Sequence, residues 1–591
     1  MNPTSDINLQ FARAFPEPIL QPHAWFLAQR LQEGHICIDI TDLPEPSNPA
    51  GWYASPQQLQ QIREWVGNEQ DTKPFILHRN KLYLHRYFQY ETNILRHIKR
   101  LLKTENSFRE IRKNALLTQS ALIATLKADY PITSLPANEK ADWSLAAMVL
   151  AFLQQFSILT GGPGTGKTTT VAKILWLHYT LQPDCRIALA APTGKAATRM
   201  ADSLLATQLP LPEAIKNQIH QLQPVTLHQL LGFQSNSIYF RHDENNPLPY
   251  DIVIIDECSM IDVALFAKLL AAIGSNTRLL LLGDKNQLAS VEAGSLFGDL
   301  CSEKSACNHF SNDTTAFING LIPDIERHIP PTISNTQHPL AEHVIELQYS
   351  HRFNSRSDIG KFSDAVLHNR IEVMETFLKQ EDGKNVQIVS SDTDSALLEF
   401  IDGFEEFILE NDIASALNKL QQLRILCAVR EGKGGLYDCN QMAESRLKKN
   451  GVIQPDSQFY ENRPIMITRN NYELGLVNGD IGIVRTVQGE KKLWLDAGNG
   501  TVRGINTNYI QEAETVFAMT IHKSQGSEYN RVFIRLPNQS DIPILTRELL
   551  YTAVTRAKQI AIIQTTEAVL KATAAGSVKR ASGITNRMDE I

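Results

Sequence analysis

The chain has 591 residues, of which 43% are hydrophobic and 20% charged, and its formal net charge is −7. At roughly 100 to 200 residues per domain, this length predicts three or four domains of ordinary globular composition. The acidic balance excludes a general nucleic-acid coat protein, which would be strongly basic, but it permits DNA binding in a local positive channel. The seven cysteines include no CxxC pair, so we expect neither a disulfide framework nor a zinc site.

The sequence carries no signal for a membrane or for secretion. No apolar run is long enough to span a bilayer. Asp6, Glu17 and two prolines interrupt the apolar residues of the N-terminus, which therefore does not read as a signal peptide. We expect a cytoplasmic protein with no membrane contact.

Residues 1–140 contain no phosphate-binding motif and are expected to form a helical N-terminal domain. Their clearest feature is a basic amphipathic stretch, residues 94–103, in which apolar residues recur at helical spacing. We interpret this stretch as a surface helix with a solvated basic face. The alternative is a helix that contacts DNA.

Residues 141–335 alternate short apolar strands with helical segments. The expected strands cover residues 156–159, 187–190, 252–255 and 279–282. This alternation is typical of an α/β domain with a parallel sheet. A polar stretch follows at residues 305–338, with Pro323, Pro330 and Pro331, and it is expected to be a long surface loop or an interdomain connection.

Residues 336–591 begin and end with a second set of α/β signals, at residues 425–429, 532–536 and 560–563. Between them, short strands at 464–468, 481–484 and 493–495 are separated by turn signals at 478–480 and 498–500. We therefore expect a second α/β domain that carries a small inserted β-barrel, at about residues 437–515.

A phosphate-binding loop follows the first expected strand. Residues 161–168 match G-x-x-x-x-G-K-[ST] and precede a helical run at 169–179, which is the context the motif requires. The glycines allow backbone N–H groups and the helix N-terminus to cradle phosphate. Lys167 would reach the β and γ phosphates and Thr168 would bind Mg²⁺. The predicted nucleotide-binding residues are Gly161, Gly162, Pro163, Gly164, Thr165, Gly166, Lys167, Thr168 and Thr169.

Two further strand ends carry candidate catalytic groups. Asp256 and Glu257 follow the apolar run at 252–255, as in a Walker B element. Asp256 would hold Mg²⁺, and Glu257 would orient and deprotonate the attacking water. Gln287 lies just beyond the strand at 279–282 and is placed to sense the γ-phosphate.

The order of these motifs resembles that of the superfamily 1 helicases over about residues 140–570. The matching segments are residues 161–168, 191–197, 226–228, 256–257, 283–288, 349–353, 519–526 and 551–558. Within that superfamily, the chain resembles the RecD-type branch, the alpha subunits of exodeoxyribonuclease V. Residues 161–173, 426–432, 463–470 and 475–482 carry this closer resemblance, and residues 82–87 carry it more weakly.

The resemblance implies two RecA-like P-loop domains with ATP in the cleft between them. It implies that Arg352 and Arg556 reach the γ-phosphate from the second domain, where they would complete a catalytic set with Lys167, Glu257 and Gln287. Such arginines stabilise the charge that spreads over the γ-phosphoryl oxygens only when the domains close. The family's adenine-reading Gln is replaced here by Ser144, which puts adenine selectivity in doubt.

The resemblance also implies a track for single-stranded DNA across both domains, with phosphate contacts and base stacking. A hairpin at about 232–250 would separate the strands, with Tyr239 and Phe240 against the terminal base pair, or it would make no DNA contact. The inserted barrel would be SH3-like, and it would clamp the outgoing strand or brace the second domain. The predicted DNA-binding residues are Thr193, Lys195, Thr226, His228, Thr520 and His522.

By the same resemblance, the chain would be a 5′–3′ DNA helicase subunit that processes double-strand ends together with beta and gamma subunits, which its N-terminal domain would bind. One alternative is a free-standing RecD-like helicase, although the first 140 residues lack the glycine-punctuated helix-hairpin-helix pairs of such relatives. The other alternative is a nucleotide-binding regulatory subunit without translocation. A GTPase is disfavoured because no Asn-Lys-x-Asp motif is present.

Overall fold

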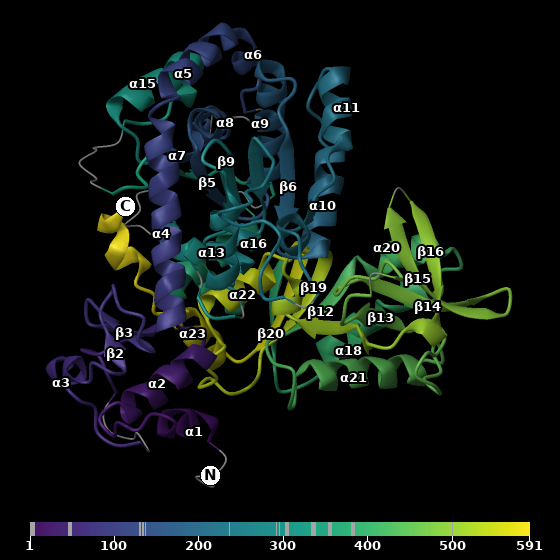
Figure 1. Ribbon diagram of the computed structural model, residues 1–591. Coiled ribbons are helices and arrows are strands. Elements are labelled where there is room, and N and C mark those ends of the chain that lie inside the picture. Colours follow the sequence, from purple (N-terminus) through teal and green to yellow (C-terminus); the bar gives the residue numbers. More distant parts are fainter. Residues whose placement is uncertain are drawn as a thin grey trace.

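The fold was obtained as a computed structural model (Figure 1), which describes most of the chain. Within the described residues, no helix is long and apolar enough to cross a membrane. Three positions of the predicted motifs and turns, Asn236, Phe353 and Asn499, lie outside them. The described residues are 6–44, 50–128, 130, 132, 135, 137–235, 237–290, 292–294, 296–301, 307–331, 338–352, 357–379, 384–471, 473–498, 500–578 and 580–591.

The N-terminal region has the expected helices, but it also contains a small sheet that the expectation of a helical domain missed. Helices α1 (Ile7–Arg13), α2 (Gln21–Gln32) and α3 (Pro56–Gln61) pack on a four-stranded sheet. Its order is β1 (Cys37–Asp39), β4 (Lys81–Leu84), β3 (Phe75–His78), β2 (Val66–Gly67). These strands have two to four residues, too few for an alternating pattern to stand out in the sequence.

The long helix α4 (His85–Glu105) links this region to the next and contains the basic stretch at 94–103. Its apolar face packs into a core of the first parallel sheet. Its basic face is not simply solvated. Arg96 pairs with Glu244 at 2.8 Å, Lys99 Nζ donates to the carbonyl of Glu590 at 2.9 Å, and Arg100 donates to the carbonyl of Ile273. Three cations of the stretch therefore join α4 to other parts of the chain. Helices α5 (Arg109–Thr118), α6 (Ser120–Thr125) and α7 (Ala137–Lys140) follow α4.

The first large sheet has six parallel strands in the order β10-β5-β9-β8-β6-β7. The strands are β5 (Phe156–Gly161), β6 (Ile187–Ala191), β7 (Val225–Thr226), β8 (Ile252–Ile255), β9 (Arg278–Gly283) and β10 (Val344–Leu347). Helices α8 (Trp143–Leu153), α9 (Lys167–Leu181), α10 (Gly194–Leu205) and α11 (Glu213–Gln221) share one core, and α4, α12 (Leu227–Leu231), α13 (Val263–Ala272) and α14 (Leu296–Leu300) share the other. Because both faces are covered, the strands read as continuous apolar runs.

The first sheet extends beyond the domain boundary expected at residues 335 and 336. Strand β10 pairs with β5 at the sheet edge, with Val344 opposite Ile158. The polar stretch before it is also more structured than a surface loop. It contains α15 (Asn312–Leu321), whose Ile318 and Leu321 are buried in the first core. The polar residues of this short helix hide its apolar face in the sequence.

The second large sheet also has parallel strands, in the order β11-β20-β19-β12-β18. They are β11 (Val386–Ser390), β12 (Leu423–Cys427), β18 (Ala518–Thr520), β19 (Tyr529–Arg535) and β20 (Ala557–Thr565). One face is covered by α16 (Asp358–Leu367), α17 (Ile371–Lys379), α22 (Arg547–Val554) and α23 (Glu567–Ala575). The other face is covered by α18 (Ser395–Asp402), α19 (Glu405–Ile408), α20 (Ile413–Leu420) and α21 (Leu436–Lys449).

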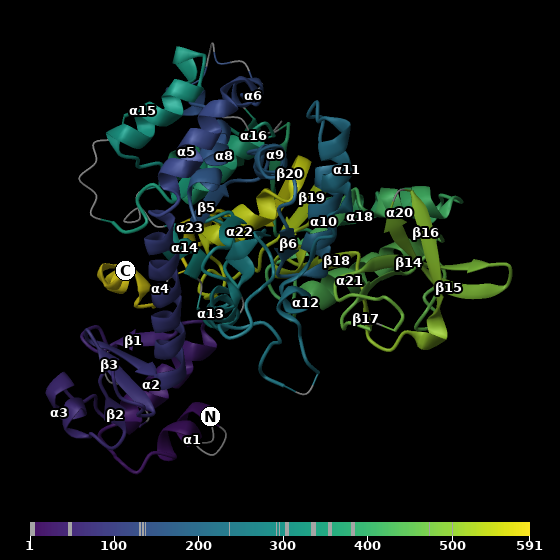
Figure 2. The same ribbon diagram turned by 45° about the horizontal axis from the view of Figure 1, so that its top comes forward.

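An antiparallel sheet is inserted between β12 and β18, and Figures 1 and 2 show it at the side of the molecule away from the N-terminal region. It starts later than the expected residue 437, because α21 buries Cys439, Ala443 and Leu447 in the second domain's core. The strand order is β16 (Thr501–Asn506), β15 (Glu490–Gly498), β14 (Ile481–Val487), β13 (Pro464–Ile467), β17 (Ala513–Thr515). The sheet has its own small apolar core.

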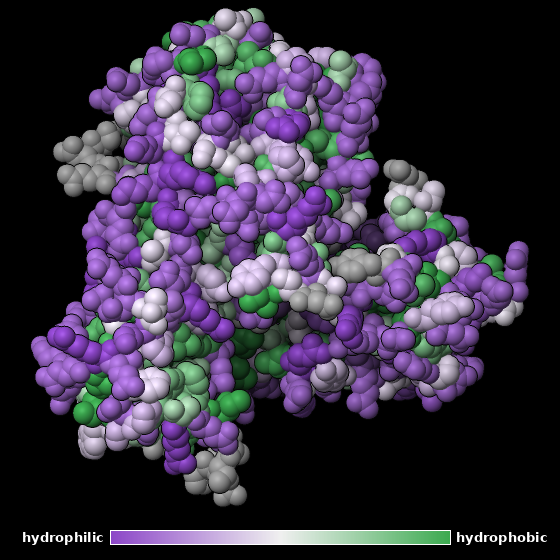
Figure 3. Space-filling view, viewed as in Figure 1, coloured by the Kyte–Doolittle hydropathy of each residue, from purple (hydrophilic) through white to green (hydrophobic). Residues whose placement is uncertain are grey.

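The C-terminal segment returns to the N-terminal region, where η6 (Ile584–Glu590) lies beside α4 (Figure 1). Gly583 N donates to the buried carboxylate of Glu91 at 2.7 Å, and Arg587 Nη2 donates to Thr92 at 2.8 Å. The face of the molecule seen in Figure 3 is largely hydrophilic, with scattered hydrophobic residues. The N-terminal region, the first sheet and the end of the chain are thus held together.

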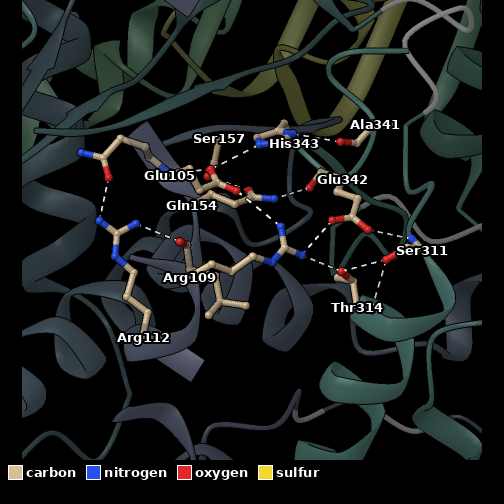
Figure 4. A network of polar contacts seen from close by, with 12 residues as sticks. Glu105, Arg109, Arg112, Gln154, Ser157, Ser311, Thr314, Ala341, Glu342 and His343 are labelled. Atoms are coloured by element: carbon tan, nitrogen blue, oxygen red, sulfur yellow. Dashed lines mark hydrogen bonds and ion pairs between the residues drawn. The ribbon is translucent and has the colours of Figure 1, made fainter. Parts of the chain in front are cut away.

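A buried polar network anchors the starting ends of β5 and β10 to α4 and α5 (Figure 4). Glu105 accepts from the backbone N of Gln155 at 2.8 Å and lies 3.3 Å from His343 Nε2. Arg109 joins Glu105 to Glu342, with 2.9 Å between its Nη2 and Glu342 Oε2. Because the other ends of β5 and β10 lead to the P-loop and to Arg352, the network sets the relative position of these two segments.

The Glu105–His343 pair should make stability depend on pH. Burial disfavours the charged His343, but the hydrogen bond and charge of Glu105 outweigh it and raise the pKa of His343. A raised histidine pKa stabilises the fold below the unfolded value of about 6.5, and this contribution disappears as the pH rises through the folded pKa. We expect Glu105→Gln to remove this dependence and to lower the apparent free energy of unfolding by about 2 kcal/mol at pH 6.

The measurement is denaturant unfolding between pH 6 and pH 9. Glu110→Gln is the control, because it removes the same charge from an exposed ion pair with Lys113 on α5. Equal pH slopes for the wild type and Glu105→Gln would show that the pair makes no such contribution.

Candidate nucleotide site between the two parallel sheets

The P-loop joins β5 to α9 at the carboxyl edge of the first sheet. Gly164 and Gly166 have φ of 75° and 86°, a left-handed conformation that suits glycine. Gly166 is also the N-cap of α9, so the positive end of the helix dipole points into the loop. A Cβ on Gly164 would lie 2.4 Å from Arg352 Cβ, so glycine is required there by space as well. The loop therefore has the backbone conformation that a phosphate cradle requires.

A cavity of about 830 Å³ opens above this loop. Both sheets contribute to it, because its wall includes Lys167 of the first domain and Arg556 of the second. Gly161 and Gly162 are not among the lining residues, but their carbonyls accept hydrogen bonds from Lys167 Nζ at 2.6 Å and 3.1 Å. The other predicted residues that line the cavity are Pro163, Gly164, Thr165, Gly166, Thr168, Thr169, Asp256, Glu257, Gln287 and Arg352.

Asp256 and Glu257 directly follow β8 and line the cavity together with the P-loop. Burial and the neighbouring Glu257 carboxylate raise the pKa of Asp256 to about 6, against the opposing charge of Lys167. Glu257 has φ of 53°, which strains a residue with a side chain and aims it into the site. Two adjacent carboxylates and the Thr168 hydroxyl offer the hard oxygen ligands that Mg²⁺ prefers. The donor set fits the expected ion.

The segment that carries Gln287 forms a direct contact between the two domains. Gln287 Nε2 and Tyr551 Oη both donate to Asp284 Oδ2, each at 3.0 Å. Leu288 N donates to Thr552 Oγ1 at 2.9 Å. The motif of the first domain is thus hydrogen-bonded to α22 of the second. Asp284 and Tyr551 lay inside predicted motifs, but no local pattern showed that they bond to each other.

Arg352 does not come from the second sheet, contrary to expectation. It lies five residues beyond the end of β10, the edge strand of the first sheet. His351 N donates to Gly164 O at 2.9 Å, and Ser350 Oγ donates to Pro163 O at 3.1 Å, so this segment packs directly on the P-loop. The strand pairing of β10 explains the error, because the domain boundary in the sequence falls later than expected.

Arg556 does come from the second domain and lies at 2% exposure at the end of α22. Its Nε and Nη1 donate to the carbonyls of Thr552 and Ser527 at 3.1 Å and 3.2 Å. Burial lowers its pKa, with Glu257 and Glu528 opposing that effect. Its guanidinium is therefore held rigidly in the cavity wall.

Arg199 and Glu528 also line the cavity, although no sequence motif singled them out. Arg199 lies on α10 of the first domain, and Glu528 immediately precedes β19 of the second. The only available signal was their proximity in sequence to the segments 191–197 and 519–526.

Ser144 is the second residue of α8 and lines the same cavity. Its Oγ lies 2.9 Å from Thr170 Oγ1 and accepts from Lys173 Nζ at 3.3 Å. Ser144 is therefore placed where it could contact a molecule in the cavity, and its expected place at the adenine-reading position stays a prediction.

The predicted DNA-binding threonines lie at the carboxyl ends of strands. Thr193 follows the end of β6, and Thr226 is the last residue of the neighbouring strand β7. Each is the N-cap of a helix: Thr193 Oγ1 accepts from Ala196 N, and Thr226 Oγ1 accepts from Gln229 N. Thr520 ends β18 on the second sheet and is buried. All three lie at the edge of the sheets where the cavity opens.

The other three predicted residues differ in accessibility. His228 is exposed, and His522 is half-buried in η5 (His522–Ser524). Lys195 is half-buried; burial lowers its pKa, and the charges of Tyr529 and Asp480 oppose this. A Cβ on the adjacent Gly194 would lie 2.6 Å from Val477 Cγ1. The connection between β13 and β14 of the inserted sheet therefore packs beside Gly194, at the start of α10.

The segment expected as a strand-separating hairpin has no strand among its described residues, 232–235 and 237–250. It is a loop closed by the bonds from Arg241 N to Gly232 O and from His242 N to Leu231 O. Tyr239 is 72% exposed, but Phe240 packs on His228, with ring centroids 5.6 Å apart. Tyr239 is therefore accessible to DNA, whereas Phe240 is part of the fold.

These elements define a class. Two parallel α/β sheets of the RecA type, joined around a P-loop cavity, form the motor core of a superfamily 1 helicase. Family models for an AAA domain and for a UvrD-like helicase C-terminal domain match residues 145–293 and 515–563.

Comparison with curated proteins gives the particular family. The chain is 32% identical to the RecBCD enzyme subunit RecD of Haemophilus influenzae, over 88% of this chain and 82% of that protein. It is 36% identical to the same subunit of Mycolicibacterium smegmatis, over 75% and 74% of the two chains. The ATP-dependent RecD2 DNA helicase of Deinococcus radiodurans is 27% identical and is covered over 46% of its length. The chain belongs to the RecD family.

The position of Ser144 predicts weak base selectivity. A Gln amide can donate to and accept from the adenine edge at once, whereas a hydroxyl bonded to Thr170 and Lys173 fits either purine. We expect Ser144→Gln to raise the ratio of kcat/KM for ATP over GTP by about tenfold, since one well-placed polar contact contributes at least that much discrimination. The measurement is steady-state hydrolysis of both nucleotides, with Ser203→Gln at another part of the cavity wall as control. An unchanged ratio would exclude base reading at this position.

Proposed function

We propose that the chain is the ATP-hydrolysing 5′–3′ DNA helicase subunit of an exodeoxyribonuclease V complex. The single observation that carries this proposal is the cavity shared by the P-loop of the first sheet and Arg556 of the second. A site divided in this way couples hydrolysis to relative motion of the two domains. The 5′–3′ direction follows from membership of the RecD family.

In this proposal, the P-loop amides and Lys167 hold the phosphates of ATP, and Thr168 and Asp256 hold Mg²⁺. The ion supplies positive charge against the β and γ phosphates. Glu257 orients the attacking water and accepts its proton. Gln287 links the γ-phosphate position to Asp284 and so to α22. Arg352 and Arg556 meet the charge that develops on the γ-phosphoryl oxygens.

Single-stranded DNA would run across the carboxyl edges of both sheets, along the six predicted DNA-binding residues. Thr226 supports this path because it ends β7 opposite Ala191, the last residue of β6, and Thr193 follows two residues later at the same edge of the first sheet. Thr520 and His522 provide the matching segment of the second domain. Contacts of this kind bind single-stranded DNA of any sequence, because every nucleotide offers a phosphate and a base face.

The partners in this proposal are a beta and a gamma subunit in the cytoplasm. The support for these partners is that relatives matching most of this chain are named as subunits of the RecBCD enzyme. The N-terminal region, residues 1–140, is the proposed partner-binding domain. The inserted sheet is proposed to be SH3-like. A free-standing helicase is the second candidate. Purifying the chain from its native host, with its neighbouring genes intact, separates the two candidates. A monomer with full processive unwinding would contradict the subunit assignment.

Lys167→Gln tests the proposed chemistry. The change removes the only charge that reaches the phosphates from within the P-loop and keeps a side chain of similar length. We expect DNA-stimulated ATP hydrolysis to fall by about a hundredfold or more, with an unchanged circular dichroism spectrum. Hydrolysis at the wild-type rate would refute the assignment as a P-loop motor.

Variants of the exposed loop at residues 232–250 test whether it separates the DNA strands. We expect deletion of residues 234–246 to preserve DNA-stimulated ATP hydrolysis and to abolish unwinding of a forked duplex. Because Phe240 packs on His228, the sharper variant is Tyr239→Ala, which removes the accessible ring alone. We expect it to slow unwinding by about tenfold, the order of one lost stacking contact. Ile238→Ala, at an equally exposed neighbour, is the control. Normal unwinding by the deletion variant would rule the loop out.

A further inference from the structure

Glu528 is the meeting point of several cations in the wall of the nucleotide cavity. Its Oε2 lies 2.7 Å from Arg352 Nη2 and 3.8 Å from Lys558 Nζ. Its Oε1 accepts a hydrogen bond from Arg199 Nη2. These groups come from separate parts of the chain: Arg199 from α10, Arg352 from the segment after β10, and Glu528 and Lys558 from the second sheet.

The electrostatics of the cluster show that Glu528 is ionised. Burial opposes its ionisation, but the charges of Arg199, Arg352 and Arg556 outweigh burial and lower its pKa to about 2. A charge-assisted bond between Arg199 and a buried carboxylate is both strong and directional. The carboxylate therefore fixes the guanidinium of Arg352 in one position beside the P-loop.

The same ion pair lies between the two segments of the proposed DNA track. Arg199 is on the helix whose N-cap is Thr193, six residues earlier, which is about 9 Å along the helix axis. Glu528 ends the segment that contains Thr520 and His522. The two segments touch, because a Cβ on Gly526 would lie 3.7 Å from Ala196 Cβ. A shift of either DNA segment must move one member of the pair.

We propose that Arg199 and Glu528 are positioning residues that transmit DNA binding to the ATP site, by setting the place of the Arg352 guanidinium next to the P-loop. Glu528 leaves Arg199 when the domains separate and pairs with it again when DNA draws the two segments together. The pair thereby makes hydrolysis depend on DNA. This inference rests on the proposed function, because it requires DNA along Thr193 and Thr520.

The alternative is that the pair only stabilises the contact between the domains. In that case its loss would weaken hydrolysis equally with and without DNA. A positioning role affects the ratio of the two rates, and it affects kcat more than KM for ATP. The two roles therefore have different kinetic signatures.

The experiment measures ATP hydrolysis by the full chain with and without an oligo(dT) strand, for the wild type, Glu528→Gln, Arg199→Gln and the double variant. We expect the ratio of DNA-stimulated to DNA-free kcat to fall about tenfold or more in each single variant, since small misplacements of a catalytic group cost up to about a hundredfold. The double variant should lose no more than either single variant, because the two residues act as one unit. Arg199→Lys keeps the charge but loses the planar fork, so it should restore part of the ratio.

Arg186→Gln is the matched control, because Arg186 pairs with Asp251 at the opposite end of the first sheet, away from the cavity. An unchanged ratio in Glu528→Gln or Arg199→Gln, or equal loss of both rates, overturns the inference. If Glu528→Gln does not fold, Arg199→Gln and Arg199→Lys decide it. A wild type that DNA does not stimulate contradicts the proposed function and this inference together, whereas stimulation that every variant retains contradicts the inference alone.

Discussion

The hydrogen bonds from Tyr551 to Asp284 and from Leu288 to Thr552 hold the carboxyl edges of two parallel sheets against each other. The assembled nucleotide site depends on that contact. The P-loop and the Asp256–Glu257 pair belong to the first sheet, and Arg556 belongs to the second. Without the contact, the first sheet retains a phosphate cradle, which many unrelated proteins share. With it, the cradle becomes one wall of a divided site.

This arrangement concentrates buried charge and backbone strain in one place. Asp256, Asp284 and Glu528 are carboxylates in the cavity wall, and Glu257 adopts a left-handed backbone conformation. Each would be costly alone. Lysine and arginine side chains from four segments compensate the carboxylates, so the charges are tolerable only in the assembled cleft. These side chains are Lys167, Arg199, Arg352 and Arg556.

The sequence predicted what is local. The P-loop, the carboxylates after β8 and Gln287 each follow an apolar strand, so their residue types and spacing predicted their place at the carboxyl edge of the sheet, and their roles stay predictions. Arg352 lines the cavity as expected but was placed in the wrong domain, because β10 joins the first sheet only through pairing with β5. The N-terminal sheet and α15 were missed because short strands and a polar helix give no clear periodicity. Arg199 and Glu528 could not be found, since their partnership exists only across the cleft.

Arg556→Lys shows whether the second domain completes the γ-phosphate site. The measurement compares DNA-stimulated kcat with the affinity for a non-hydrolysable ATP analogue, using Arg531→Lys on the same sheet as control. We expect kcat to fall by about a hundredfold or more, while the affinity changes by no more than about threefold. Retained hydrolysis would show instead that the site is complete within the first domain.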